Sequence, residues 1–201
     1  MRFTGEVTED EVIAEFLKGE FKSDRWNRGL RALLDEHGVS DDVLARPVLT
    51  DWEQNNARRR LLDEHRGFVR REGLFDGFPD DVVWQRATLE PDEVLAVLYI
   101  NWDWWLTVSG GTRRPREAAR RIRRDEFAGV TAEEHEPLAV ALLDDPPPPP
   151  LIAATTPAHA PLVLVEGHFR LTAYALFPQH LPPELEILLG ISAGMREWSE
   201  F

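Results

Sequence analysis

The stretch PLVLVEGHFRLTAY, residues 161–174, constrains the fold most strongly, because an apolar run passes through one glycine directly into a helical pattern. The run LVLV, residues 162–165, is apolar at every position, as in a central strand that is covered on both faces. Gly167 lets the backbone turn tightly after that strand. Residues 168–177 then follow the helical period. The sequence therefore predicts a strand, a tight turn at Gly167 and a helix.

Two further strands and a spacer surround this unit. Residues 151–156, LIAATT, predict one strand, and residues 184–191, ELEILLGI, alternate in the manner of another. Five consecutive prolines, residues 146–150, predict a stiff polyproline spacer that delivers the chain to the first of these strands. The expected order after the spacer is strand, strand, helix, strand.

The first ninety residues are predicted to be helical. Three segments combine a capping residue, an apolar stripe at helical spacing and a terminal glycine. They run from Thr8 to Gly19, from Ser23 or Asp24 to Gly38, and from Thr50 to Gly67. Residues 73–89 carry loop signals. We therefore expect an α+β fold, with a helical region at residues 1–90 and a small mixed-sheet α/β domain at residues 91–201.

The part of the second region before the spacer is less regular. Residues 94–100 form an apolar run that fits a strand or a helix equally well. Pro115 stands at the first position of an expected helix. A further helix is expected at residues 131–143, where Pro137 permits only a kinked or late-starting version.

Composition excludes several classes of function. The net charge of −13 argues against a protein whose main activity is gripping a nucleic-acid backbone. The chain has no cysteine, which removes disulfides, thiolate metal sites and cysteine nucleophiles. The six histidines lack zinc-ligand spacing, so no zinc site is expected. Because no apolar run approaches about 18 residues, we expect a soluble, cytoplasmic protein with no membrane partner.

Residues 166–172 form the first candidate site. A strand that ends in glycine and runs into a helix exposes the first N–H groups of that helix, which favour an anion. Arg170 can offer two parallel donors to an oxyanion, and His168 can donate to the same phosphate. Thr172 adds a hydroxyl, unless the helix register turns this side chain into the core. Glu166 can hold a magnesium ion, orient the imidazole or accept a proton from a substrate hydroxyl. Physical chemistry leaves a structural alternative open, in which Glu166 and Arg170 form a local ion pair.

The pattern LVLVEGHFRLTAY resembles the box that marks the ParB/sulfiredoxin-like superfamily, a hydrophobic strand followed by Asp/Glu-Gly-His-His-Arg-x-x-Ala. Glu166, Gly167, His168, Arg170 and Ala173 match this box, whereas Phe169 stands where many members have a second histidine or glutamine. The resemblance covers residues 148–192 well and 94–192 loosely. It implies a small mixed-sheet domain whose loop grips the phosphates of a nucleotide such as CTP, ATP or ADP, usually with magnesium. Sulfiredoxin's own chemistry is excluded, because the chain has no cysteine.

Residues 109–115, SGGTRRP, form the second candidate site. Gly110 and Gly111 can form a backbone nest for an anion, while Ser109, Thr112 and Arg113 supply donors just before a helix. The alternative is a glycine turn that leads into an exposed, arginine-rich helix. Residues 113–124 are rich in arginine, which fits a local nucleic-acid contact or docking against the acidic helical region.

These observations lead to one functional hypothesis and two alternatives. The main hypothesis is a protein that binds a nucleotide or another phosphorylated small molecule. If it is an enzyme, phosphoryl transfer or nucleotide hydrolysis is the expected class, with Glu166 and His168 as catalytic groups and magnesium held by Glu166. The first alternative is a non-catalytic interaction or regulatory protein that uses its helical region to bind a protein partner. The second is a nuclease, which the acidic net charge disfavours.

Overall fold

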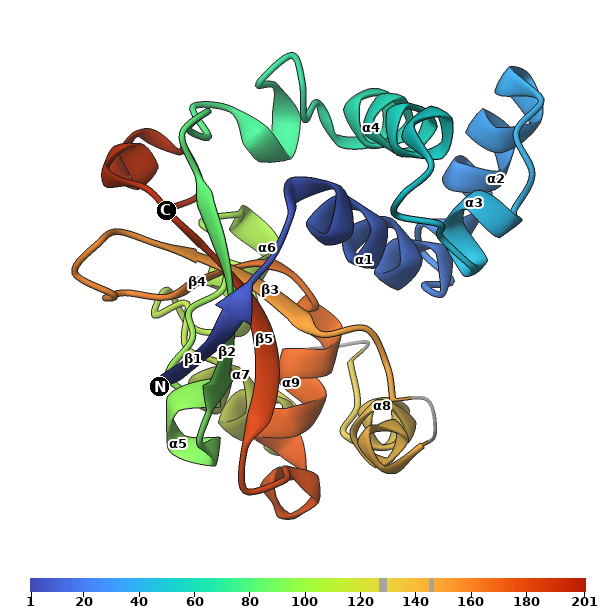
Figure 1. Cartoon of the computed structure of the whole chain (residues 1–201). Coiled ribbons are helices and arrows are strands. Elements are labelled where there is room, and N and C mark those ends of the chain that lie inside the picture. The colour runs from blue at the N-terminus through green and yellow to red at the C-terminus, as the bar shows by residue number, and fades with distance from the viewer. Residues whose placement is uncertain (127–129, 145–146) are drawn as a thin grey trace.

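The computed structural model describes residues 1–126, 130–144 and 147–201, and it shows an α+β fold with a five-stranded mixed sheet. Figure 1 shows helices α1 to α4 gathered beside one end of the sheet, with the other helices around its remaining length. Within the described ranges, no helix combines the length and apolar character that crossing a bilayer requires. The α+β class expected from the sequence is confirmed.

The sheet has the strand order β1-β2-β5-β3-β4. Its strands are β1 (Arg2–Glu6), β2 (Val83–Leu89), β3 (Leu151–Thr155), β4 (Val163–Glu166) and β5 (Leu185–Ile191). Strands β3 and β5 pair in parallel, and the other neighbours are antiparallel. The predicted order of strand, strand, helix and strand after the proline spacer is confirmed by β3, β4, α9 (His168–Leu176) and β5.

Strands β1 and β2 lie in the region that was expected to be helical or looped. All five residues of β1 are exposed, so the strand has no alternating apolar pattern to reveal it. In β2 only Trp84, Ala87 and Leu89 are buried, and their spacing is irregular. Because both strands join the sheet that β3, β4 and β5 form, residues 1–90 share that sheet with the second half of the chain.

Four helices lie between β1 and β2 along the chain. They are α1 (Glu9–Phe21), α2 (Asn27–His37), α3 (Asp42–Ala45) and α4 (Trp52–Arg66). Thr8 caps α1 by accepting a hydrogen bond from the N–H of Glu11, and Gly38 and Gly67 end α2 and α4 in left-handed conformations, as predicted. These glycine ends satisfy carbonyl groups that the helices leave unpaired.

Three predicted helix boundaries are wrong. Gly19 does not end α1, which continues to Phe21. Helix α2 starts after Trp26 rather than at Ser23 or Asp24, because residues 23–26 form a turn. The side chain that caps α4 is Asp51, which accepts from two N–H groups, and not Thr50.

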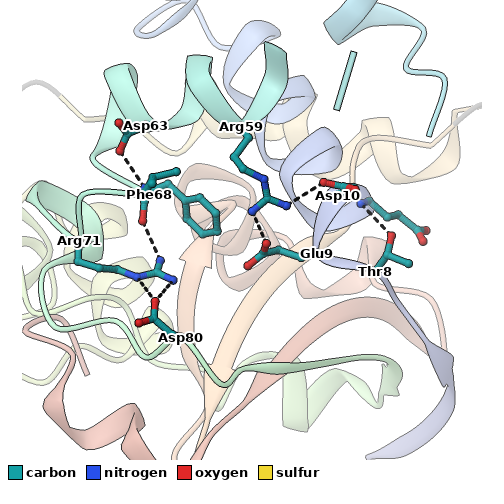
Figure 2. A network of polar contacts seen from close by, with 10 residues as sticks. Thr8, Glu9, Asp10, Arg59, Asp63, Phe68, Arg71 and Asp80 are labelled. Atoms are coloured by element: carbon teal, nitrogen blue, oxygen red, sulfur yellow. Dashed lines mark hydrogen bonds and ion pairs between the residues drawn. The ribbon is translucent and has the colours of Figure 1, made fainter. Parts of the chain in front are cut away.

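Arginines hold the helical segments together (Figure 2). Arg59 of α4 forms ion pairs with Glu9 and Asp10 in the first turn of α1. Arg71 pairs with Asp80 and donates to the main-chain oxygen of Phe68. The acids at the start of α1 also complement the positive end of its dipole. The Arg59 ion pairs fix the first turn of α1 on α4.

The remaining helices are short. They are α5 (Pro91–Val94), α6 (Asp103–Val108), α7 (Pro115–Arg123) and α8 (Glu136–Val140), followed by α9, with 3₁₀ turns at 73–75, 133–135, 141–143, 178–180 and 193–197. Pro115 begins α7 and Pro137 lies in the first turn of the late-starting α8, as predicted. Helices α7 and α8 both pack against α9. Of the proline spacer, Pro146 lies outside the described residues, and the other four prolines are in neither helix nor strand.

Strand β4 is not a central strand, although its apolar run predicted one. It is the last strand of the sheet, yet Val163, Leu164 and Val165 are buried. The segment that follows α5 covers this edge, where the N–H of Leu98 donates to Leu162 and the N–H of Leu164 donates to Leu98. Residues 95–100 are therefore neither a regular strand nor a helix, and their main-chain contacts cover the edge of β4 that faces away from β3.

Candidate functional site

A cavity of about 600 Å³ lies where the helical segments meet the end of β4. Its walls come from the end of α1 and the turn after it, from α4, from the aromatic segment around α6, and from residues 165–170. Trp26, Trp102 and Trp105 supply aromatic surface. Pro148 and Pro149 of the spacer also line it, which the sequence did not indicate. This volume is within the range that accommodates small organic ligands.

The turn between β4 and α9 requires glycine. Gly167 has a φ of +104°, in the left-handed region that other residues rarely adopt. A Cβ atom there would lie 2.5 Å from Cδ2 of Leu151 and 3.1 Å from Nη2 of Arg170. The absence of a side chain therefore lets the guanidinium of Arg170 fold back over the turn.

Glu166 and Arg170 form an ion pair four residues apart, through Oε2 and Nη2. Both side chains are largely buried, with exposed fractions of 13% and 9%. This is the local ion pair that the structural alternative anticipated. Both residues nevertheless line the cavity, together with Gly167 and His168. The pair is thus part of the cavity wall.

A second buried acid from the helical segments stands beside this pair. Glu20 of α1 accepts from Nε2 of His65 at 2.5 Å and from Nε of Arg66 at 3.0 Å. The guanidinium of Arg66 lies 3.6 Å above the ring of Trp26. Glu20, Trp26 and Arg66 all line the cavity. This cluster was not predicted from the sequence, because its members are spread over three segments and match no spacing motif.

Gly19 is the point at which the two clusters touch. A Cβ atom on Gly19 would lie 3.0 Å from the carboxylate atoms of Glu166. Contacts this short are tighter than ordinary van der Waals packing. Gly19 therefore lets the last turn of α1 approach the Glu166 carboxylate. This explains why a glycine stands inside a helix that it does not end.

The two ionisable groups of the motif have strongly shifted pKa values. Burial raises the pKa of Glu166 to about 7, with Arg170 opposing the rise and Glu20 adding to it. The pKa of His168 is lowered to about 3, chiefly by burial and in addition by the positive charges of Arg66 and Arg170. At neutral pH His168 is therefore a neutral imidazole, and Glu166 is close to the midpoint of its titration.

Two buried nitrogen atoms of the motif lack hydrogen-bond partners among the described residues. They are Nε2 of His168 and Nε of Arg170. The His168 ring stacks on Trp105 at a centroid distance of 4.9 Å, so its orientation is fixed. Unpaired buried polar atoms are rare in folded proteins, and two of them occur here within one helical turn beside a cavity.

Thr172 does not join the cavity. Its side chain is buried, its O–H donates to the main-chain oxygen of His168, and its oxygen accepts at 2.7 Å from the hydroxyl of Tyr99. The hydroxyl therefore fastens α9 to the segment that covers β4. Thr172 is placed by the structure in the core, away from the ligand role that the sequence assigned to it.

The second candidate loop is also separate from the cavity. Ser109 is buried and donates to the main-chain oxygen of Trp105, and its oxygen accepts from the N–H of Arg113. The Arg113 guanidinium donates to the main-chain oxygens of Tyr99, Phe201 and Glu200, at 2.7, 2.6 and 2.8 Å. Thr112 bonds within the same turn.

None of the five candidate residues from 109 to 113, Gly110 and Gly111 included, lines the cavity. The loop at 109–113 therefore does not share this cavity with residues 166–170. The donors of Ser109, Thr112 and Arg113 are directed to oxygens of the chain itself. In this arrangement the loop holds the main chain of three segments together.

The prediction that Glu166 holds magnesium can be compared with the side chains that are placed to bind a metal ion. In the described part of the chain, no group of three or more histidine, aspartate and glutamate side chains is placed to hold a metal ion. Glu166 already pairs with Arg170, and Glu20 pairs with His65 and Arg66. Magnesium usually keeps several waters and substrate phosphates as ligands. Glu166 therefore fits magnesium only as a single protein ligand to an ion that a phosphate group brings.

Comparison with known proteins adds no family to these observations. The chain matches no protein-family model, no curated protein and no solved structure. The function is therefore inferred from the cavity and the residues that line it.

Proposed function

We propose that the cavity binds a small organic anion, and that a nucleotide is the ligand class that fits it best. The unpartnered nitrogens of His168 and Arg170 beside the cavity carry this proposal. Residues 168–170, the first turn of α9, line the same wall, and the start of a helix favours negative charge. The tryptophans of the cavity supply the apolar surface that a base or another planar ring needs.

The pairing of Arg170 with Glu166 determines how an anion would enter. A phosphate oxygen that approaches Arg170 competes with the Glu166 carboxylate, and two like charges in a buried site raise the pKa of the carboxyl group. Glu166 then takes up a proton and releases the guanidinium to the ligand. Because the pKa of Glu166 is already about 7, this proton uptake costs little at neutral pH. The resemblance of residues 148–192 to the ParB/sulfiredoxin-like superfamily supports the same ligand class.

Thermal unfolding with CTP, ATP, ADP and GTP, each with and without magnesium, tests the proposal. A ligand at a hundred times its dissociation constant stabilises a protein by about 2.7 kcal/mol. The variant Arg170→Lys keeps the charge and loses the planar fork, so we expect it to weaken binding by about tenfold. Arg60→Lys on the exposed face of α4 is the matched control. The proposal fails if no nucleotide stabilises the protein, or if Arg170→Lys binds as well as Arg60→Lys.

A second function uses the same cavity without catalysis. Residues 19, 20 and 22–26 line the cavity, so a bound ligand contacts the helical segments directly. A nucleotide could then regulate how these helices meet a protein partner. Phosphate release, or transfer of phosphate to added hydroxyl compounds such as free amino acids, distinguishes the enzyme from the regulator. Whether the protein proves to be an enzyme or a regulator, the variant Glu166→Gln shows whether this carboxylate accepts a proton or contributes to binding.

A further inference from the structure

A second hollow, of about 510 Å³, lies at the opposite end of α9 from the cavity. Its floor includes Leu95, Ala119 and Ala175, and arginines of α7 stand around it. The four arginines are Arg116, Arg120, Arg123 and Arg124. Positions separated by four, seven and eight residues share one face of a helix. Helix α7 therefore presents its arginines to this hollow as one row, in a protein whose net charge is −13.

Arg123 donates to the main-chain oxygen of Leu176, whereas the other three arginines of the row are more than half exposed. Arg116 pairs with Asp92, and Arg120 with Glu117 at 2.5 Å, but both arginines are more than half exposed. Arg124 is 63% exposed and lies 3.7 Å from Glu126. Exposed pairs of this kind contribute little and exchange partners readily. None of these ion pairs involves an acid of α1 to α4, so docking of the row on the helical segments does not explain it.

We infer that this hollow is a docking surface for an acidic segment of a protein partner. The planar guanidinium groups match carboxylates through paired hydrogen bonds, and the apolar floor accommodates an aliphatic side chain between them. A long nucleic-acid backbone fits less well, because the charge of −13 repels it beyond the hollow. The inference is independent of the ligand in the cavity.

The test uses the full chain and a fluorescein-labelled octapeptide in which aspartates and glutamates flank one leucine. Fluorescence anisotropy measures its dissociation constant. The double variant Arg120→Gln/Arg124→Gln should weaken binding by about tenfold or more. The control Arg28→Gln/Arg60→Gln removes the same charge from exposed positions of α2 and α4, and should leave binding within about twofold.

A third variant changes binding in the opposite direction. Among the described residues that line the hollow, Asp92 is the one with an acidic side chain. Asp92→Asn removes its competition for Arg116 and should tighten peptide binding by about threefold, a gain that misfolding does not produce. The inference is overturned if the wild type fails to bind the peptide at about 1 mM. It is also overturned if both double variants lose affinity equally, or if a single-stranded oligonucleotide of the same net charge binds more tightly than the peptide.

Discussion

Two turns of this protein share a sequence pattern and differ in what their arginine contacts. Each turn has a glycine at positive φ, Gly111 in one and Gly167 in the other, and an arginine follows within three residues. Arg113 donates to three main-chain oxygens. Arg170 pairs with one carboxylate and keeps an unpartnered Nε at the wall of a cavity. A guanidinium enclosed by carbonyl groups is structural, whereas one held by a titratable carboxylate can change partners.

The largest effect is expected at Arg113. Arg113→Ala leaves the oxygens of Tyr99, Glu200 and Phe201 without this donor, which should lower the free energy of unfolding by about 4 kcal/mol. Urea denaturation measures the loss. The dissociation constant of any nucleotide that the folded protein binds should not change, because Arg113 is outside the cavity wall. A stable variant with impaired nucleotide binding would reverse the roles of the two turns.

The glycines of the two turns should differ next. Gly167→Ala imposes backbone strain and a 2.5 Å approach to Cδ2 of Leu151, so we expect a loss of about 3 kcal/mol in unfolding free energy. Gly111→Ala meets no atom within 4 Å and should cost only the strain of a φ of +82°, about 1 kcal/mol. Denaturation of both variants under one condition tests the difference. Equal losses would show that the space around Gly167 does not matter.

Glu166 should make stability depend on pH. The pKa of about 7 in the folded chain exceeds its ordinary value of 4.5, so the folded protein holds the proton more tightly than the unfolded chain. The resulting stabilisation is complete below pH 4.5 and is lost as pH rises through 7, by an amount on the order of 2 kcal/mol. Glu166→Gln lacks this dependence. Unfolding free energies at about pH 5 and pH 8 measure it, and parallel profiles for the two proteins would contradict it.

The contribution of His168 to stability should change with pH in the opposite direction to that of Glu166. Its pKa of about 3 in the folded chain lies below its ordinary value of 6.5. It therefore contributes stability that is present above pH 6.5 and is lost as pH falls toward 3. His168→Asn should remove a contribution that rises with pH between about 3 and 6.5, whereas Glu166→Gln should remove one that falls with pH between 4.5 and about 7. Two variants that change the slope of the profile in the same direction would mean that the groups titrate as one pair.

Much of the fold around Gly167 could be predicted, because local signals and tertiary structure agree there. An apolar strand, a glycine and a helical period need only neighbouring residues for their identification. Strand β1 could not be predicted, since all its residues are exposed and its order comes from pairing with β2. The prediction that β4 is a central strand was wrong for a related reason. Its side chains are buried although β4 is the last strand of the sheet, and such burial produces the same apolar run as a position in the middle of a sheet.

Only the part of the candidate site that residues 166–170 form could be predicted from the sequence. Glu166, Gly167, His168 and Arg170 lie consecutively or within one helical turn, so the sequence brings them together. Glu20 and Arg66 reach them through packing of α1 on α4, which no local pattern encodes. Gly19 was interpreted as a helix end because glycine ends many helices. Its actual role, a close approach to Glu166, becomes visible only when β4 is placed beside α1.

The smallest effect compares the two threonines that the sequence assigned to ligand binding. Thr172→Val removes a partner of the buried Tyr99 hydroxyl and should cost about 1.5 kcal/mol. Thr112 is exposed and bonds only within its own turn, where water can replace the hydroxyl, so Thr112→Val should cost about 0.5 kcal/mol. Denaturation gives both values, and titration with the best nucleotide should show unchanged affinity for Thr112→Val. A loss of affinity there, at so small a cost in stability, would return the loop at 109–113 to the ligand site and remove the distinction between the two turns.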